Sequence, residues 1–200
     1  IFLGPLVTGL AVFIMAEIYR EKTLKLGKAL REASSKYLSV FFIILCVTAL
    51  FFAALRFSSW ALAKYFIAGH KTLLHLPVQV WLGPVMIAIN LCFVVLIQGL
   101  FVYSVPLVML ENMKLVRAIG GSVLLFFKLF LPTVILIVIP LLFVVPVIVL
   151  QYNTAVIVNL NVPELVLYIA VAAVLVNGLI VDLFITAATT VLYLENKEKL

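Results

Sequence analysis

Long and nearly uninterrupted hydrophobic runs dominate this sequence, and short polar segments separate them. Lipid leaves only helices or closed barrels as spanning structures, and a helix needs roughly 20 apolar residues to cross. A barrel would show short segments of alternating polarity, whereas these runs are continuous. The pattern therefore predicts an all-α, polytopic transmembrane helical bundle forming one domain over residues 1–200. Five spans are expected, at residues 1–19, 37–56, 80–110, 121–150 and 164–194.

The last three of these spans are longer than a bilayer requires. Tilt, kinks or interfacial ends must absorb the excess length. The fourth span also carries Pro132, Pro140 and Pro146, and each proline removes a backbone N–H donor and pushes on the preceding turn. We therefore expect the fourth span to be bent or broken.

An amphipathic connector, residues 20–36, follows the first span. Leu26, Leu30, Ala33 and Tyr37 recur at helical spacing, which predicts a helix lying in the headgroup plane with its apolar stripe in the acyl boundary. A passive interfacial connector is the main interpretation, and partner binding or lipid sensing is the alternative. Its cations are expected to contact anionic lipid headgroups: Lys22, Lys25, Lys28, Arg31 and Lys36.

Two further segments connect spans. Residues 57–79 mix aromatic and polar side chains and are too interrupted to span, so we expect an interfacial loop with a surface helix on the outer side. Residues 111–119 form a shorter connector that ends at Gly120-Gly121. A helix can turn sharply into the membrane at such a glycine pair.

The segment LVMLENMKLVRAI, residues 107–119, returns near the end of the chain as VLYLENKEKL, residues 191–200. FIMAEIYREK at residues 13–22 shares its pattern, so that Glu17, Glu111 and Glu195 each mark the edge of a span. Membrane helices often end in Glu and Lys at the interface, which is one explanation. The other is a duplicated helical hairpin, with spans two and three as one copy and spans four and five as another.

The composition agrees with a membrane location. The chain is 66% hydrophobic and only 11% charged, which excludes an ordinary soluble domain. Most of the 14 basic residues follow the first, third and fifth spans, so the positive-inside rule predicts a multi-pass protein with a cytoplasmic C-terminus. This topology explains the net charge of +6, and we expect no nucleic-acid partner.

Few polar side chains fall inside the spans, and they form the candidate site. Asp182 is the one carboxylate well inside, and a lone charge there costs a few kcal/mol or more unless it is paired or protonated. We expect it to face protein, with Lys128 as its cationic partner, either as an interhelical hydrogen-bonding group or as part of a proton or substrate relay. The intramembrane polar candidates are Asp182, Asn177, Thr186, Asn90, Gln98 and Lys128.

Catalytic motifs are absent from the sequence. His70 and His75 lie five residues apart and do not share a helix face, and Cys46 and Cys92 fall inside spans as small apolar residues. We therefore predict no catalytic, cofactor-binding or metal-ligating residues, and a protein that is not an enzyme. An intramembrane enzyme whose partner domain lies elsewhere is the weakest alternative.

Three stretches carry a resemblance to a known family: GPLVTGLAVFIMAEIYREK, PLVMLENMKLVRAIGGSVLLFFK and TAATTVLYLENK. They resemble the membrane domain attached to some bacterial glycerophosphoryl diester phosphodiesterases, and related six-helix inner-membrane proteins of unassigned activity. The phosphodiesterase domain with its acidic metal-binding residues is not present in these 200 residues, so the resemblance implies a membrane scaffold without hydrolase activity. The matching positions include Gly4, Pro5, Gly9, Pro106, Glu111, Ala118, Ser122, Thr190 and Tyr193.

These observations favour a non-catalytic inner-membrane protein that acts as a scaffold or accessory subunit of a larger membrane complex, in contact with anionic lipid and with protein partners. The alternative is a transporter or channel for a lipid or small solute, using the proline-containing fourth span and Asp182. The hairpin repeat and the family resemblance further predict one more helix upstream of Ile1, which would give six spans. A cleaved signal peptide is the alternative at that end.

Overall fold

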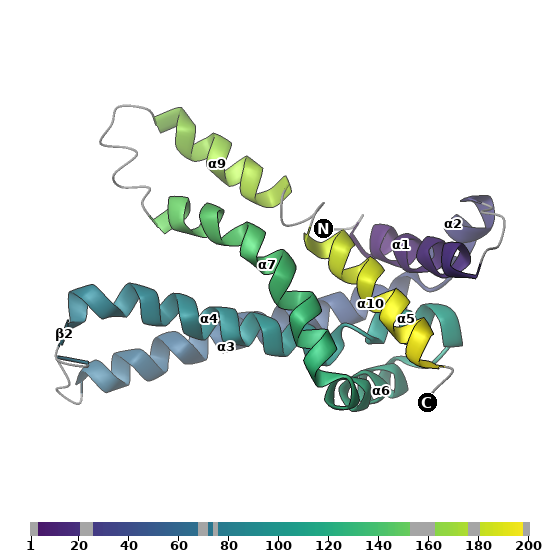
Figure 1. The fold of residues 1–200 in the computed structure, drawn as a ribbon, viewed down its shortest axis with the longest axis horizontal. Helices are drawn as coiled ribbons and strands as arrows, with labels where there is room; N and C mark the ends of the chain where they lie inside the picture. Colours follow the sequence, from purple (N-terminus) through teal and green to yellow (C-terminus); the bar gives the residue numbers. More distant parts are fainter. Residues whose placement is uncertain are drawn as a thin grey trace.

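The computed structural model describes residues 4–20, 26–67, 72–73, 76–152, 163–175 and 181–197. This part of the chain is all-α, with one short antiparallel strand pair between two of the helices (Figure 1). The strands are β1 (Thr72–Leu73) and β2 (Leu76–Pro77). The helices are α1 (Gly4–Tyr19), α2 (Leu26–Ser35), α3 (Tyr37–Ile67), α4 (Val78–Phe101), α5 (Ser104–Glu111), α6 (Leu115–Lys128), α7 (Phe130–Tyr152), α9 (Pro163–Leu175) and α10 (Asp182–Lys197).

Two helical stretches are long and apolar enough to cross a membrane: Tyr37–Ala61 of α3, and Val85–Glu111 through α4 and α5. A third is added if α6 and the first part of α7 count as one bent span. The first expected span corresponds to α1, which is apolar but has 16 residues. The fifth corresponds to α9 and α10, and residues 176–180 between them lie outside the described part. Five spans are therefore shown only in part.

Helix α3 runs well beyond the expected end of the second span at residue 56. It continues to Ile67, so residues 57–67, the first part of the expected interfacial segment, are helical and continuous with the second span. The segment contains no Gly or Pro, and the Ser58 and Ser59 hydroxyls donate to the Leu55 carbonyl within the helix, so nothing in it stops the helix. Further along, the Lys64 ammonium lies 4.3 Å from the centroid of the Trp60 ring.

The third expected span is interrupted between α4 and α5 by a turn at residues 102–103. Pro106 explains the break, since it has no N–H to offer the residue-102 carbonyl and would clash with it. Ser122 of α6 compensates: its hydroxyl donates to the Leu100 carbonyl at 2.7 Å and accepts from the Tyr103 N–H at 3.2 Å. A neighbouring helix thus satisfies the freed backbone groups, as the interior of a membrane requires.

The fourth expected span is broken, as predicted, but the break lies at Leu129 and not at one of its prolines. Helix α6 ends at Lys128 and α7 begins at Phe130, with 95° between them. Pro132 lies in the first turn of α7, where a missing N–H is tolerated, while α7 continues through Pro140 and Pro146. The turn predicted at Gly120-Gly121 is wrong, because both glycines lie inside α6.

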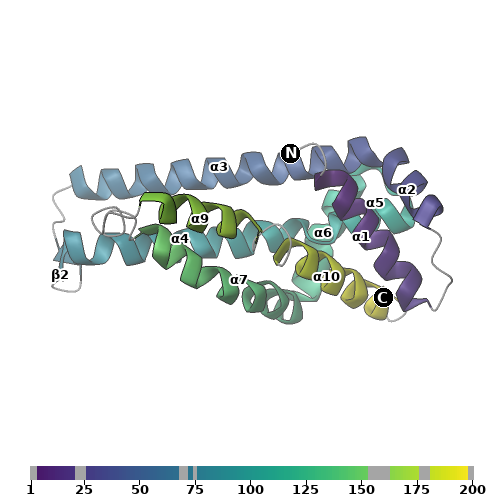
Figure 2. The same ribbon diagram turned by 90° about the horizontal axis from the view of Figure 1, so that it is seen from above.

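The largest buried core lies at one end of the molecule, where α1, α2, α5 and α10 meet the start of α3 (Figure 2). Tyr103, Val12 and Val40 are fully buried there. The whole core cluster comprises Val12, Ala16, Ala33, Val40, Ile43, Tyr103, Val105, Leu107, Val108, Met109, Ala118, Tyr193 and Leu194. The three Glu-marked helix ends of the repeated pattern therefore lie at the same end of the fold.

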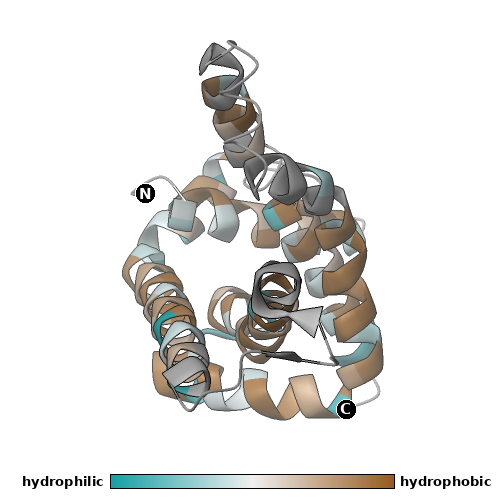
Figure 3. Ribbon diagram, turned by 90° about the vertical axis from the view of Figure 1, so that its left-hand side faces the viewer, coloured by the Kyte–Doolittle hydropathy of each residue, from teal (hydrophilic) through white to brown (hydrophobic). Residues whose placement is uncertain are grey.

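Two helical hairpins extend from this core. Helices α3 and α4 lie side by side, and α7 packs against α9. The two pairs diverge: the separation between α7–α9 and α3–α4 increases with distance from the core (Figure 1). We call them the α3–α4 arm and the α7–α9 arm. Seen end-on, hydrophobic residues dominate the described ribbon (Figure 3), as expected for helices that face lipid.

Candidate functional site

Three of the intramembrane polar candidates line one cavity: Gln98, Asp182 and Thr186. The cavity has a volume of about 510 Å³ and lies between α1, α3, the α4–α5 turn and α10. Residues from four distant parts of the sequence therefore contribute to it. We call it the polar cavity, and its remaining lining residues are Gly4, Pro5, Thr8, Ile43, Ile44, Val47, Thr48, Phe101, Val102, Val105, Pro106 and Ile185.

Two acceptor groups of the polar cavity have no partner. The Gln98 side-chain oxygen is buried and makes no hydrogen bond. Asp182 is the first residue of α10, and within the described residues neither a hydrogen bond nor an ion pair involves its carboxylate. Asp182 is exposed and lines a cavity between helices. Buried polar groups are usually satisfied, so the unpartnered Gln98 oxygen is notable, and together with the Asp182 carboxylate it marks the cavity as a candidate site.

The predicted pairing of Asp182 with Lys128 is not observed. Lys128 lies in the last turn of α6, is exposed, and does not line the polar cavity. The 95° bend explains this, because α6 ends at Lys128 and the chain turns there, so that Lys128 does not continue along α7. Asn90 instead lies beside Ser58, whose hydroxyl contacts the Asn90 side-chain oxygen at 3.3 Å. Asn177 lies outside the described residues.

The basic residues of the connector, residues 20–36, lie in different environments. Lys22 and Lys25 lie outside the described residues, whereas Arg31 is exposed, as a lipid contact requires. Lys28 lies 5.6 Å from the centroid of the Phe13 ring. On the same helix, Leu26 and Leu30 are exposed while Ala29 and Ala33 are buried, so the leucines face outward and the alanines face the protein.

Lys36 makes contacts with the protein in place of the lipid contact that we predicted. Its side chain is only 15% exposed, and its ammonium donates to the Met109 carbonyl at 2.7 Å and lies 3.6 Å from Glu32. Met109 is in the last turn of α5, where carbonyls have no helical N–H partner. Lys36 therefore caps a helix end and holds the start of α3 against α5, which the sequence-based prediction missed.

Glu111 directly connects the two repeated stretches, residues 107–119 and 191–200, which we call the Leu-Glu-Asn segments. It accepts a hydrogen bond from the Tyr193 hydroxyl, and its Oε1 atom lies 2.7 Å from the Lys197 ammonium. The Glu111 side chain is 20% exposed, and that of Lys197 is 47% exposed, so the pair lies at the edge of the core. The chain can turn after Glu111 because Asn112 adopts a left-handed conformation, with a φ of 55°. We call Glu111, Tyr193 and Lys197 the glutamate node.

A second buried polar contact was not foreseen from the sequence. The Thr133 hydroxyl donates to the Leu129 carbonyl at 2.6 Å, and so accepts from the Tyr103 hydroxyl, also at 2.6 Å. Both side chains are fully buried. This contact ties the α4–α5 turn to the first turn of α7. No spacing rule connects a tyrosine with a threonine 30 residues away, so the sequence carried no signal for it.

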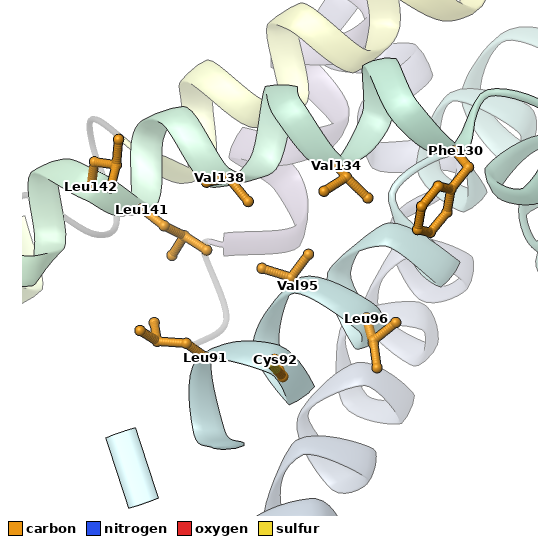
Figure 4. Close-up of a pocket in the computed structure, with 9 residues that line it drawn as sticks. All are labelled: Leu91, Cys92, Val95, Leu96, Phe130, Val134, Val138, Leu141 and Leu142. Carbon is orange, nitrogen blue, oxygen red and sulfur yellow. The ribbon is translucent and has the colours of Figure 1, made fainter. Parts of the chain in front are cut away.

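An apolar groove separates α4 from α7 where the two arms begin to diverge. Its volume is about 420 Å³, and side chains from the two helices point toward one another across it (Figure 4). Cys92, one of the two free cysteines, is among the lining residues, and the rest are Leu91, Val95, Leu96, Phe130, Val134, Val138, Leu141 and Leu142. Every lining side chain in the described part of the chain is apolar.

Within the described residues, no group of three His, Cys, Asp or Glu side chains is arranged to hold a metal ion, and His70 and His75 lie outside this part. Comparisons with protein-family models, with curated proteins and with solved structures found no match to this chain. The functional argument therefore rests on the geometry of the chain itself.

Proposed function

We propose that this protein is a non-catalytic, multi-pass membrane protein that acts as a scaffold or accessory subunit of a larger membrane assembly. Its location would be the bacterial inner membrane, with the glutamate node on the cytoplasmic side, since the basic residues gather there. The observation that carries the proposal is the contrast between the two ends of the fold. A buried core ties together six helices at one end, namely α1, α2, α3, α5, α6 and α10, while two apolar arms diverge from it.

Such a shape suits a component that holds other membrane helices. The described residues that line the groove between α4 and α7 are all apolar, and Leu142 among them is 61% exposed. Helices in lipid associate through close van der Waals packing, so an apolar groove between rigidly joined helices is a packing surface for a partner's helix. The Tyr103–Thr133 contact and the Ser122 bonds keep the base of the groove in place.

Site-specific photo-crosslinking in native membranes tests the proposal. A photoreactive residue at Val138 or Leu142 is expected to yield one defined protein adduct, which also co-purifies stoichiometrically in mild detergent. The matched control is Val116 of α6, which is 80% exposed and does not line the groove. Adducts with lipid only, or the same protein adducts from Val116, would argue against a scaffold that uses this groove.

A transporter or channel is the second candidate, and one observation favours it. Gln98 of α4 lines a common cavity with Asp182 and Thr186 of α10, although Gln98 is far from the other two in the sequence. A transporter with this cavity on its path should lose flux in Asp182→Asn with its fold intact. A scaffold should keep its partner in the same variant.

A further inference from the structure

We infer that the polar cavity binds a small primary ammonium ion that carries an apolar body. Among the described residues that line the cavity, Asp182 is the one with a charged side chain, so this part of the lining attracts cations. The buried Gln98 side-chain oxygen adds a hydrogen-bond acceptor that has no donor. The ligand must therefore supply both positive charge and N–H donors, which a primary ammonium ion does with three hydrogens.

The hydroxyl groups of the cavity are compatible with the same ligand. Thr8 already donates to the Gly4 carbonyl at 3.0 Å, so its oxygen is left as an acceptor. Thr48 and Thr186 also line the cavity, and a threonine oxygen can accept from a cationic donor. A carboxylate, an amide oxygen and hydroxyl oxygens together form an acceptor-rich set, which would not suit an anion.

The apolar residues of the cavity indicate that the rest of the ligand is hydrocarbon. Ile43, Val47, Phe101 and Ile185 are among the apolar residues that enclose the cavity. Its volume of about 510 Å³ is roughly three times the ~150 Å³ that accommodates benzene in an apolar cavity. A bare inorganic ion would leave these walls uncovered, whereas an amine with a short hydrocarbon chain would cover them and gain the associated burial energy.

Charge energetics favour occupancy. A carboxylate that lines a largely apolar cavity without a cationic partner is unfavourable, and a bound cation removes that penalty. Primary alkylamines ionise with a pKa close to that of the lysine side chain, about 10.4, so they are cationic at neutral pH. The site thus recognises the ammonium group through Asp182 and Gln98, and the hydrocarbon through the helix faces.

Calorimetric titration of the purified protein in phosphatidylcholine nanodiscs tests this inference, with n-butylammonium as the probe. We expect saturable binding of n-butylammonium and none of 1-butanol, which has a similar shape but no charge. Tetramethylammonium carries the charge without N–H donors and is expected to bind at least several-fold more weakly. Sodium binding without ammonium binding would overturn the inference, as would equal binding of the alcohol and the amine.

Variants locate the site. Asp182→Asn should raise the Kd for n-butylammonium at least tenfold, and Gln98→Leu should raise it several-fold. Glu32→Gln is the matched control, because it makes the same change at a carboxylate outside the cavity, and it should bind as the parent does. An unchanged Kd in both cavity variants refutes the site. Because Asp182 makes no hydrogen bond or ion pair within the described residues, Asp182→Asn should fold, and Gln98→Leu provides a second, independent variant.

Repeating the titration in nanodiscs that contain phosphatidylethanolamine identifies the source of the ammonium group. Competition by this lipid would assign the site to a lipid headgroup, and unchanged binding would assign it to a free amine. Either result is independent of the scaffold proposal, which concerns the groove between α4 and α7 and is tested there by crosslinking.

Discussion

The Tyr193 hydroxyl donates a hydrogen bond to the carboxylate of Glu111, 82 residues earlier in the chain. Lys197, one turn further along α10, forms an ion pair with the same carboxylate. The two Leu-Glu-Asn segments are thus in direct contact, and they have different roles in that contact. The first contributes the glutamate, and the second contributes the tyrosine and the lysine.

Replacing Glu111 with Gln should lower the free energy of unfolding by ~1–3 kcal/mol, the usual loss when a hydrogen bond to a charged group is removed. Most of this loss should come from the buried Tyr193, because Lys197 is about half exposed and its ion pair is screened by solvent. Denaturant or thermal unfolding in detergent measures the change.

A double-mutant cycle of Glu111→Gln and Tyr193→Phe checks that the loss arises from this contact, and a coupling energy of at least ~0.5 kcal/mol is expected. Glu32→Gln alters an i,i+4 pair whose glutamate side chain is 40% exposed, and it should change stability by less than ~0.5 kcal/mol. Strictly additive effects of the two node variants would show that the glutamate node does not act as a unit.

A Cβ atom at Gly99 would lie 2.9 Å from Phe126 Cδ2 and closer still to Cε2. Phe126 is fully buried, and its ring packs edge-to-face against Phe127 and Phe130, so it has little room to move. Gly99→Ala should therefore destabilise the protein by ~1–3 kcal/mol despite the better helix propensity of alanine. Thermal unfolding in detergent is the measurement.

The matched control for Gly99 is Gly120→Ala, where nothing lies within 4 Å of the added atom. There the entropic benefit of alanine inside a helix should raise stability by ~0.5–1 kcal/mol. Combining Gly99→Ala with Phe126→Leu should reduce the penalty of the alanine. A Gly99→Ala variant as stable as the parent protein would mean that α4 and α6 are not in close contact.

Ser122→Ala should destabilise the protein by ~1–3 kcal/mol, because it leaves the Leu100 carbonyl and the Tyr103 N–H without partners in an apolar surrounding. Ser122→Thr retains the hydroxyl and should recover part of the loss. Amide exchange of Tyr103 provides the local readout, since it should accelerate in the alanine variant before the core of α1 and α10 opens. Unchanged exchange at Tyr103 would contradict the role of Ser122.

The orientation predicted by the basic residues can be measured by cysteine labelling in intact cells, after Cys46 and Cys92 are replaced by alanine. Lys28→Cys on α2 should be labelled only by permeant reagents, and Lys64→Cys near the other end of α3 should be labelled by impermeant ones. Both side chains are exposed, so accessibility within the protein does not limit the reaction. Labelling of position 28 by an impermeant reagent would reverse the orientation.

Sequence reasoning went furthest where one physical rule dominates. Hydrophobic length predicted the α3 and α4–α5 spans, and periodicity predicted α2. It failed where contacts between residues far apart in the sequence determine where a helix bends or ends. The bend at Leu129 and the continuation of α6 through Gly120 depend on the packing of α6 against α5 and α4, which no local pattern encodes.

For the polar residues too, the sequence predicted which residues matter but not their tertiary contacts. The rarity of polar groups in apolar runs identified Asp182, Gln98 and Thr186, but their common cavity depends on how α4 and α10 approach each other. Lys36 was assigned to lipid because its charge lies on an amphipathic helix, whereas it binds a carbonyl of α5. A hydrogen bond to a backbone group 73 residues away leaves no trace in composition or spacing.

The confinement of the main core to one end of the molecule has a mechanical consequence. Beyond that core, the outer parts of the α3–α4 and α7–α9 arms are supported by the surrounding medium more than by each other. In a bilayer, the hydrophobic lengths of the arms must match the local hydrocarbon thickness, and helices adjust by tilting at a cost of fractions of a kcal/mol per Å. We therefore expect a thinner membrane to spread the arms and a thicker one to draw them together, which would make the width of the groove between them depend on lipid composition.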